Sequence, residues 1–173
     1  MTQSQQQAAP QNPLQDEIAA LVNLYQSGLM VKAEQTCREL LKTYPQSLFV
    51  MNVLGAALSA QGKLKESVQV FDKVIQLKPD FAEAYFNRGI ALNELGLSGE
   101  AVSSYNKAIE FKPDYIKAHN NRGNALRKLG QQDEAVASFD TALQFRPDYA
   151  EAYSNRGNAL RELNQPDAAL ASF

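Results

Sequence analysis

The sequence has 173 residues, of which 45% are hydrophobic and 21% charged, proportions that are usual for a globular protein. Its 17 basic and 19 acidic residues give a net charge of −2, which argues against the clustered positive charge that nucleic-acid binding requires. A single cysteine excludes a disulfide framework, and no apolar run approaches the roughly 18 residues of a membrane span. We therefore expect a cytoplasmic protein that binds neither nucleic acid nor membrane and uses no cofactor or metal.

The first segment, residues 1–13, is rich in glutamine and has the sequence MTQSQQQAAPQNP. It lacks the basic start and the apolar centre of a secretory signal. A polar segment of this kind cannot bury enough apolar surface to fold, so we expect it to be disordered.

From residue 14 onward the sequence repeats with a period of 34 residues. The segments AYFNRGIAL (84–92), AHNNRGNAL (118–126) and AYSNRGNAL (152–160) follow one another at this spacing. Prolines and glycines recur with the same period, as Pro45, Pro79, Pro113 and Pro147 and as Gly55, Gly89, Gly123 and Gly157. The expected units are 14–47, 48–81, 82–115, 116–149 and a truncated 150–173. Such a period is typical of arrays in which neighbouring units share a core.

Each unit is expected to form a first helix, a turn and a second helix. In the fourth unit the first helix should start after Asp114, whose side chain can cap it, and should run to about Leu129. The pairs Asp80–Glu83 and Asp148–Glu151 have the spacing of a capping box in the third and fifth units.

The first helices are expected to end at glycines that adopt a left-handed conformation. These are Gly28, Gly62, Gly96 and Gly130. The second helix of the fourth unit should cover about 133–145, with Ala135, Phe139 and Ala142 on one face, and should stop before Pro147.

Gly123 lies in the middle of a predicted helix, where glycine is unfavourable, so a packing reason is expected. Without a Cβ atom it allows a bulky side chain of the paired helix to approach the backbone. We therefore predict that Gly123→Ala destabilises the protein by about 1–3 kcal/mol. His119 on the same stripe is expected to be a packing residue as well.

The sequence predicts no catalytic site. Cys37 shares its repeat position with Phe71 and Phe139, so it is expected to be a small core residue. It lies more than two units from His119, the only histidine, so the two cannot form a dyad. The arginines that precede the packing glycines are expected to cover apolar surface and to reach carboxylates between units; they are Arg88, Arg122 and Arg156. We expect that the chain by itself is not an enzyme.

The pattern closely resembles the tetratricopeptide repeat over residues 14–173. The resemblance rests on a small residue within each first helix, on an Ala–bulky–Ala pattern in the second, and on the proline near the end. It implies an all-α fold, a right-handed α-solenoid of helix–turn–helix repeats. The first helices would line an inner, concave wall in such a solenoid.

The inner wall is the expected binding surface because amides gather at its positions. An amide offers two donors and one acceptor, which matches a peptide backbone. The basic residues would favour acidic or phosphorylated segments. The candidates are Asn52, Asn87, Lys117, Asn120, Asn121, Asn124, Arg127, Lys128, Asn155, Asn158 and Arg161. The alternative is that these asparagines only solvate the helix or bond to the next repeat.

The row Asn87, Asn121 and Asn155 is similar to the arrays of O-linked N-acetylglucosamine transferases and SPINDLY-like proteins, in which an inner asparagine ladder binds extended protein substrates. The carboxylate clamp of co-chaperone domains is not expected, because no lysine occupies its position in any unit. We expect a scaffold that binds an extended peptide or partner segment. Two alternatives are an accessory domain of a larger transferase and a self-association module around Phe173, where the last repeat would expose its core.

Overall fold

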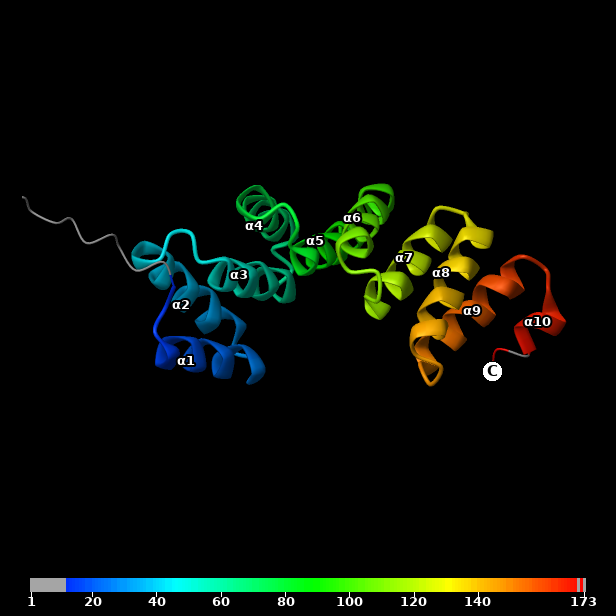
Figure 1. The fold of residues 1–173 in the computed structure, drawn as a ribbon, viewed down its shortest axis with the longest axis horizontal. Coiled ribbons are helices and arrows are strands. Elements are labelled where there is room, and N and C mark those ends of the chain that lie inside the picture. The colour runs from blue at the N-terminus through cyan, green and yellow to red at the C-terminus, as the bar shows by residue number, and fades with distance from the viewer. Residues whose placement is uncertain (1–11, 171, 173) are drawn as a thin grey trace, which may run out of the picture. The chain divides into compact units, whose positions relative to one another are not determined.

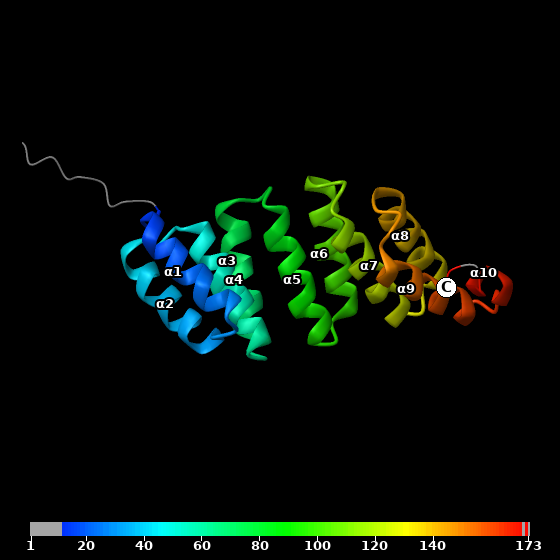
Figure 2. The same ribbon diagram turned by 90° about the horizontal axis from the view of Figure 1, so that it is seen from below.

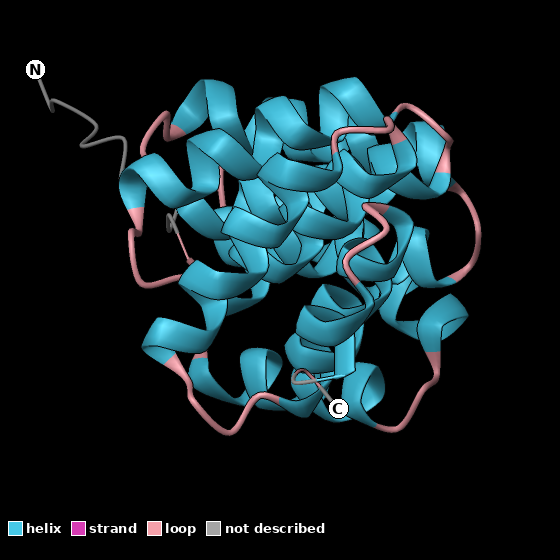
Figure 3. Cartoon of the chain, turned by 90° about the vertical axis from the view of Figure 1, so that its right-hand side faces the viewer, coloured by secondary structure: helices cyan, strands magenta, loops and turns pink. Residues whose placement is uncertain are grey.

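The structure is a computed structural model that describes residues 12–170 and 172. These residues form ten helices and no strand, as the cyan helices and pink loops of Figure 3 illustrate. The all-α fold that the repeat pattern predicts is therefore confirmed. Most of the expected disordered segment 1–13, and Phe173 of the expected self-association surface, lie outside the described residues. No helix of the described part is long and apolar enough to cross a membrane.

The chain divides into two compact units, Met1–Leu77 and Lys78–Phe173. The helices of the N-terminal unit are α1 (Gln15–Gln26), α2 (Met30–Thr43), α3 (Leu48–Ala60) and α4 (Leu64–Leu77). The helices of the C-terminal unit are α5 (Ala82–Glu94), α6 (Ser98–Phe111), α7 (Ile116–Lys128), α8 (Gln132–Phe145), α9 (Ala150–Glu162) and α10 (Pro166–Leu170). Figure 1 labels them in chain order, and each expected repeat contains one successive pair.

In the N-terminal unit, helix α2 packs between α1 and α3, and α3 packs on α4. Leu21, Cys37, Val50 and Leu58 are fully buried in the core that these helices share. Burial raises the pKa of the Cys37 thiol to about 12, so the thiol stays protonated and unreactive at neutral pH. The prediction that Cys37 is a small core residue is confirmed.

In the C-terminal unit, each helix packs against the next one along the chain, and the first helices also contact each other. The contacts between first helices are α5 with α7 and α7 with α9. Figure 2 shows the labelled helices α5 to α9 following one another from green to orange. The face of α7 and α9 where these first helices meet is called the inner face below.

The mid-helix glycines fit against aromatic rings of the paired second helices, as predicted. A Cβ atom at Gly123 would lie 2.5 Å from Cε1 of Phe139, which is fully buried. The same fit recurs between Gly55 and Phe71 and between Gly89 and Tyr105. Each helix pair is therefore closer at this point than any side chain on the first helix would allow.

The ends of the first helices agree with the prediction, but their starts do not. Gly28, Gly62, Gly96 and Gly130 have φ between 72° and 80°, and Asn164 takes the same place in the last repeat with φ of 58°. The expected caps Asp80, Asp114 and Asp148 are wrong. Helices α5, α7 and α9 follow Phe81, Tyr115 and Tyr149, and none of these residues makes a side-chain cap.

The reason is a tight turn that comes before each of these helices. In the third repeat the amide of Phe81 donates to the carbonyl of Lys78 at 3.2 Å, which places Pro79 and Asp80 at the two central positions of the turn. Proline favours the first of these positions because its φ is already fixed. The aspartates are thus turn residues, one position too early to cap the helix.

Candidate functional site

The inner face carries a polar network, centred on one buried amide, that joins α7 to α9. Asn120 is fully buried; its Oδ1 accepts from Nδ2 of Asn155 at 3.0 Å, and its Nδ2 donates to Oε1 of Glu151 at 2.9 Å. The hydroxyl of Tyr149 donates to the other oxygen of Glu151 at 3.1 Å. Buried amides are stable when their hydrogen bonds are satisfied, and these bonds hold one repeat on the next.

The burial of Asn120 corrects the expectation that it faces a partner. A helical period gives the direction of a side chain but not its depth, and Asn120 points into the seam where α9 covers it. Asn155 is half-buried and has one donor engaged in the same seam. The asparagines Asn120 and Asn155 therefore bond one repeat to the next, which was the alternative to binding a partner.

Asn121 is also committed to the protein interior. Its side chain lies close enough to the hydroxyl of Tyr105 on α6 to affect the pKa of that group. Burial raises the pKa of Tyr105 well above its usual value, and the nearby amide of Asn121 acts in the opposite direction. Asn87, the equivalent residue of α5, is half-buried, as is Asn52 on α3 in the N-terminal unit.

Asn124 and Asn158 occupy equivalent positions on α7 and α9 and are the more available amides. Both are half-buried. The Oδ1 of Asn158 accepts from Nη2 of Arg161 at 3.1 Å, while its amide nitrogen keeps its donors. The side chain of Asn124 makes no hydrogen bond to any residue that the structure describes.

The basic candidates divide into one ion-paired residue and three exposed ones. Arg127 donates from Nη1 to Oε1 of Glu162 at 2.7 Å, which links α7 to α9 again. Lys117, Lys128 and Arg161 are exposed, and none of the described carboxylates pairs with them; Lys128 donates only to Oδ1 of Asn93 at 3.2 Å. The positive charge of these three exposed candidates is therefore not neutralised by a carboxylate that the structure describes.

The inner side of α5 is aromatic, which the repeat pattern did not lead us to expect. Phe86, which takes the repeat position of Asn120, lies with its ring centre 4.7 Å from that of Tyr115 and 6.0 Å from that of Tyr105. The amides therefore do not form one unbroken row from α5 to α9. An aromatic residue in place of an amide was the visible signal for this difference.

The sequence profile of the TPR repeat family matches residues 55–96, 99–130 and 123–164, which together make up more than half of the chain. The chain belongs to the TPR repeat family. No curated protein sequence matches it significantly.

Solved TPR structures resemble this chain closely in fold. A crystal structure of MamA has a TM-score of 0.81 at 22% identity, over 87% of this chain and 88% of that one. MamA residues 41 to the end, from Desulfovibrio magneticus RS-1, give 0.82 at 19% identity over 93% of each chain. YrrB, described as a TPR protein with an unusual peptide-binding site, gives 0.74 at 19% identity over 92% and 82%. At these identities the likeness establishes the TPR fold alone.

The arginines next to the packing glycines form hydrogen bonds from the first to the second helix segment of a TPR pair. Each bonds to a serine 16 residues later; the pairs are Arg88 Nη1 with Ser104 Oγ at 2.8 Å, Arg122 Nε with Ser138 Oγ at 3.0 Å, and Arg156 Nη1 with Ser172 Oγ at 2.7 Å. This serine column was not predicted, although its 34-residue period was visible in the sequence. Arg156 also reaches a carboxylate, as predicted, because its Nε lies 2.5 Å from Oδ1 of Asp140.

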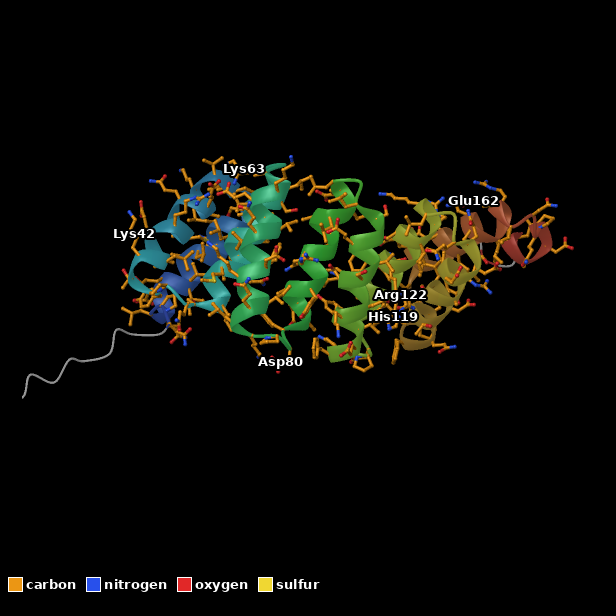
Figure 4. The ribbon with its side chains drawn as sticks, turned by 90° about the horizontal axis from the view of Figure 1, so that it is seen from above. Lys42, Lys63, Asp80, His119, Arg122 and Glu162 are labelled. Atoms are coloured by element: carbon orange, nitrogen blue, oxygen red, sulfur yellow. The ribbon has the colours of Figure 1, made fainter. Side chains whose placement is uncertain are left out.

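His119 has the packing role that the sequence predicts. It is 4% exposed, its Nε2 lies 2.8 Å from the carbonyl oxygen of Pro113, and its ring centre lies 5.9 Å from that of Phe145. Burial lowers its pKa, with the charge of Arg122 contributing. The labels of Figure 4 place His119 and Arg122 on the same helix, α7. The described residues contain no cluster of three or more histidine, cysteine or acidic side chains that could hold a metal.

Proposed function

We propose that this TPR array is a protein-interaction scaffold that binds an extended segment of a partner protein along the inner face of α7 and α9. The observation that carries the proposal is the pair Asn124 and Asn158. These amides recur with the repeat period, lie on neighbouring helices, and keep donors that the seam between the helices does not use. An extended backbone presents donors and acceptors at regular intervals, which two such amides can bind.

The charge of the inner face favours an acidic segment. Lys117, Lys128 and Arg161 are exposed and have no carboxylate partner among the described residues. Cations in such a position increase the rate of association with acidic peptides and make binding dependent on salt. Binding of an acidic or phosphorylated segment should therefore weaken as ionic strength rises.

The resemblance to the arrays of O-linked N-acetylglucosamine transferases supports the mode of binding, in which amides hold a peptide backbone. In this chain the binding amides would be one helical turn away from the ladder row. Asn155 of that row bonds to Asn120, and Asn121 lies close to the hydroxyl of Tyr105, whereas Asn124 and Asn158 are open to a ligand. YrrB, which is described as having an unusual peptide-binding site, supports peptide binding on this fold. We propose binding, without catalysis by this chain, as its role.

The test begins with peptides selected from a displayed random library against the whole chain. Their affinities are then measured by isothermal titration calorimetry for the native chain and for Asn124→Ala/Asn158→Ala. We expect the double variant to lose at least tenfold in affinity, about 1.4 kcal/mol. The matched control, Gln76→Ala/Gln144→Ala, removes two exposed amides from second helices and should bind normally. Full affinity of the inner-face variant would refute the proposal.

A further inference from the structure

The opposite side of α7 carries a cavity that the inner face does not use. It has a volume of about 340 Å³ and lies among α6, α7 and α8 of the C-terminal unit. Val102 and Leu126 give it apolar walls, and the guanidinium of Arg122 is the cationic group that lines it. A volume near the lower end of ligand pockets suits one or two side chains of a partner.

Arg122 brings a positive charge to this cavity that nothing compensates. Its Nε donates to Oγ of Ser138 at 3.0 Å and its Nη1 to Oδ1 of Asn106 at 3.2 Å, both of which are neutral groups. Glu134 also lines the cavity and is exposed, but no described carboxylate, Glu134 included, comes within 4.0 Å of the guanidinium. Burial lowers the pKa of Arg122, the direction expected for a charge that has lost water without gaining a counter-charge.

The next repeat shows which group suits such a guanidinium. Arg156 and Asp140 follow Arg122 and Asn106 by one period of 34 residues. There, Oδ1 of Asp140 lies 2.5 Å from Nε of Arg156 and compensates its charge. Asn106 replaces that aspartate with an amide, which accepts one bond and leaves the charge in place.

In the equivalent cavity of the N-terminal unit, the lining arginine is paired with carboxylates. It has about 330 Å³ and is lined by Leu54 and Val70, which stand at the repeat positions of Arg122 and Ser138. The arginine that does line it, Arg38, forms ion pairs with both Glu34 and Glu66. Lys73 also lines that cavity, but it is exposed to water. A half-buried guanidinium without a carboxylate partner therefore distinguishes the cavity at Arg122 from the N-terminal one.

We propose that the cavity at Arg122 binds the side-chain carboxylate of an aspartate in a segment of a partner protein. A guanidinium has five donors, of which Ser138 and Asn106 use two, so it can bind a carboxylate with those that remain. An apolar side chain next to that aspartate would lie against Val102 and Leu126. Binding at this site does not depend on peptide binding at the inner face.

The test uses two blocked dipeptides as probes, Ac-Leu-Asp-NH₂ and its neutral isostere Ac-Leu-Asn-NH₂. Each is titrated into the ¹⁵N-labelled chain at low salt, and binding is followed by the backbone amide resonances of α6 to α8 and the Nε–H of Arg122. We expect the aspartate probe to shift these resonances and to bind at least tenfold more tightly than the asparagine probe, because the bond is charge-assisted. Equal binding of the two probes would overturn the proposal.

Two variants close the site in opposite ways. Asn106→Asp supplies the carboxylate from within the chain, as Asp140 does for Arg156, and Arg122→Leu/Ser138→Val copies Leu54 and Val70 of the N-terminal unit. Both should lose at least tenfold in affinity for the aspartate probe, and Asn106 is exposed, so Asn106→Asp should keep the native circular dichroism. Asn124→Ala/Asn158→Ala should bind the probe normally, which separates this site from the inner face. Undiminished binding by Asn106→Asp would overturn the proposal.

Discussion

Gly123→Ala tests the packing on which the repeat geometry depends. The new Cβ atom would lie 2.5, 2.7 and 2.9 Å from three ring atoms of Phe139, where ordinary contacts are 3.4–4 Å. The ring would have to move by nearly 1 Å, and it has no space to do so because Phe139 is fully buried. Alanine gains about 1 kcal/mol over glycine in helix propensity, but overpacking costs about 1–3 kcal/mol and sometimes more. Because three ring atoms clash, we expect the upper end of that cost and a net loss of about 1–2 kcal/mol.

The assay is urea unfolding followed by far-ultraviolet circular dichroism, since the chain has no tryptophan to report by fluorescence. Gly99→Ala is the matched control, because Gly99 lies in α6 and no atom lies within 4 Å of the place that an added methyl group would take, so the variant should be unchanged or more stable. Phe139→Leu should partly rescue Gly123→Ala, with a coupling energy of about 1 kcal/mol or more. If Gly123→Ala were as stable as the native chain, or showed no coupling to Phe139, the packing role of Gly123 would be refuted.

Three further predictions concern buried polar groups. Because burial lowers the pKa of His119, protonation opposes folding; stability should be complete above about pH 6.5 and decline below it, and His119→Tyr should remove this dependence in thermal melts at several pH values. Hydrogen bonds from Lys63, Gln61 and Arg38 lower the pKa of Glu34 to about 2, despite the opposing effect of burial, so its contribution is present above about pH 4.5 and is lost as pH falls towards 2. Lys63 and Arg38 are nearly half exposed, and water weakens their interaction with the carboxylate, so Glu34→Gln should cost only about 1–3 kcal/mol in urea unfolding at pH 7. An unchanged free energy of unfolding would contradict the role of these bonds. Asn120→Ala should cost about 1–3 kcal/mol and should speed hydrogen exchange in α9, whereas unchanged exchange would show that the network does not join the helices.

Much of the fold could be predicted from the sequence because the period fixes many positions at once. Gly123 and Phe139 recur at equivalent places in neighbouring repeats, so their contact could be expected without coordinates. The helix starts were less predictable. Asp114 suits an N-cap and a turn equally well, and only the backbone bonds that follow Pro113 decide between them.

The site was predictable only in part, because burial depends on the neighbouring repeat. Asn120 and Asn124 share one face of α7 by helical geometry, yet α9 covers the first and leaves the second half-exposed. The role of Asn106 could have been noticed as an amide in a position where Asp140 stands one period later. The cavity beside Arg122 could not be predicted from sequence, because it arises from the packing of three helices.

Asn124 and Asn158 are the residues through which we expect the inner face of α7 and α9 to bind an extended peptide. The most direct measurement of their role is a titration of the labelled chain with a selected peptide, following the side-chain NH₂ resonances of its asparagines. We predict that the resonances of Asn124 and Asn158 shift with saturation, while those of the buried Asn120 change little. Shifts confined to α6 and α8, with Asn124 and Asn158 unmoved, would contradict this role.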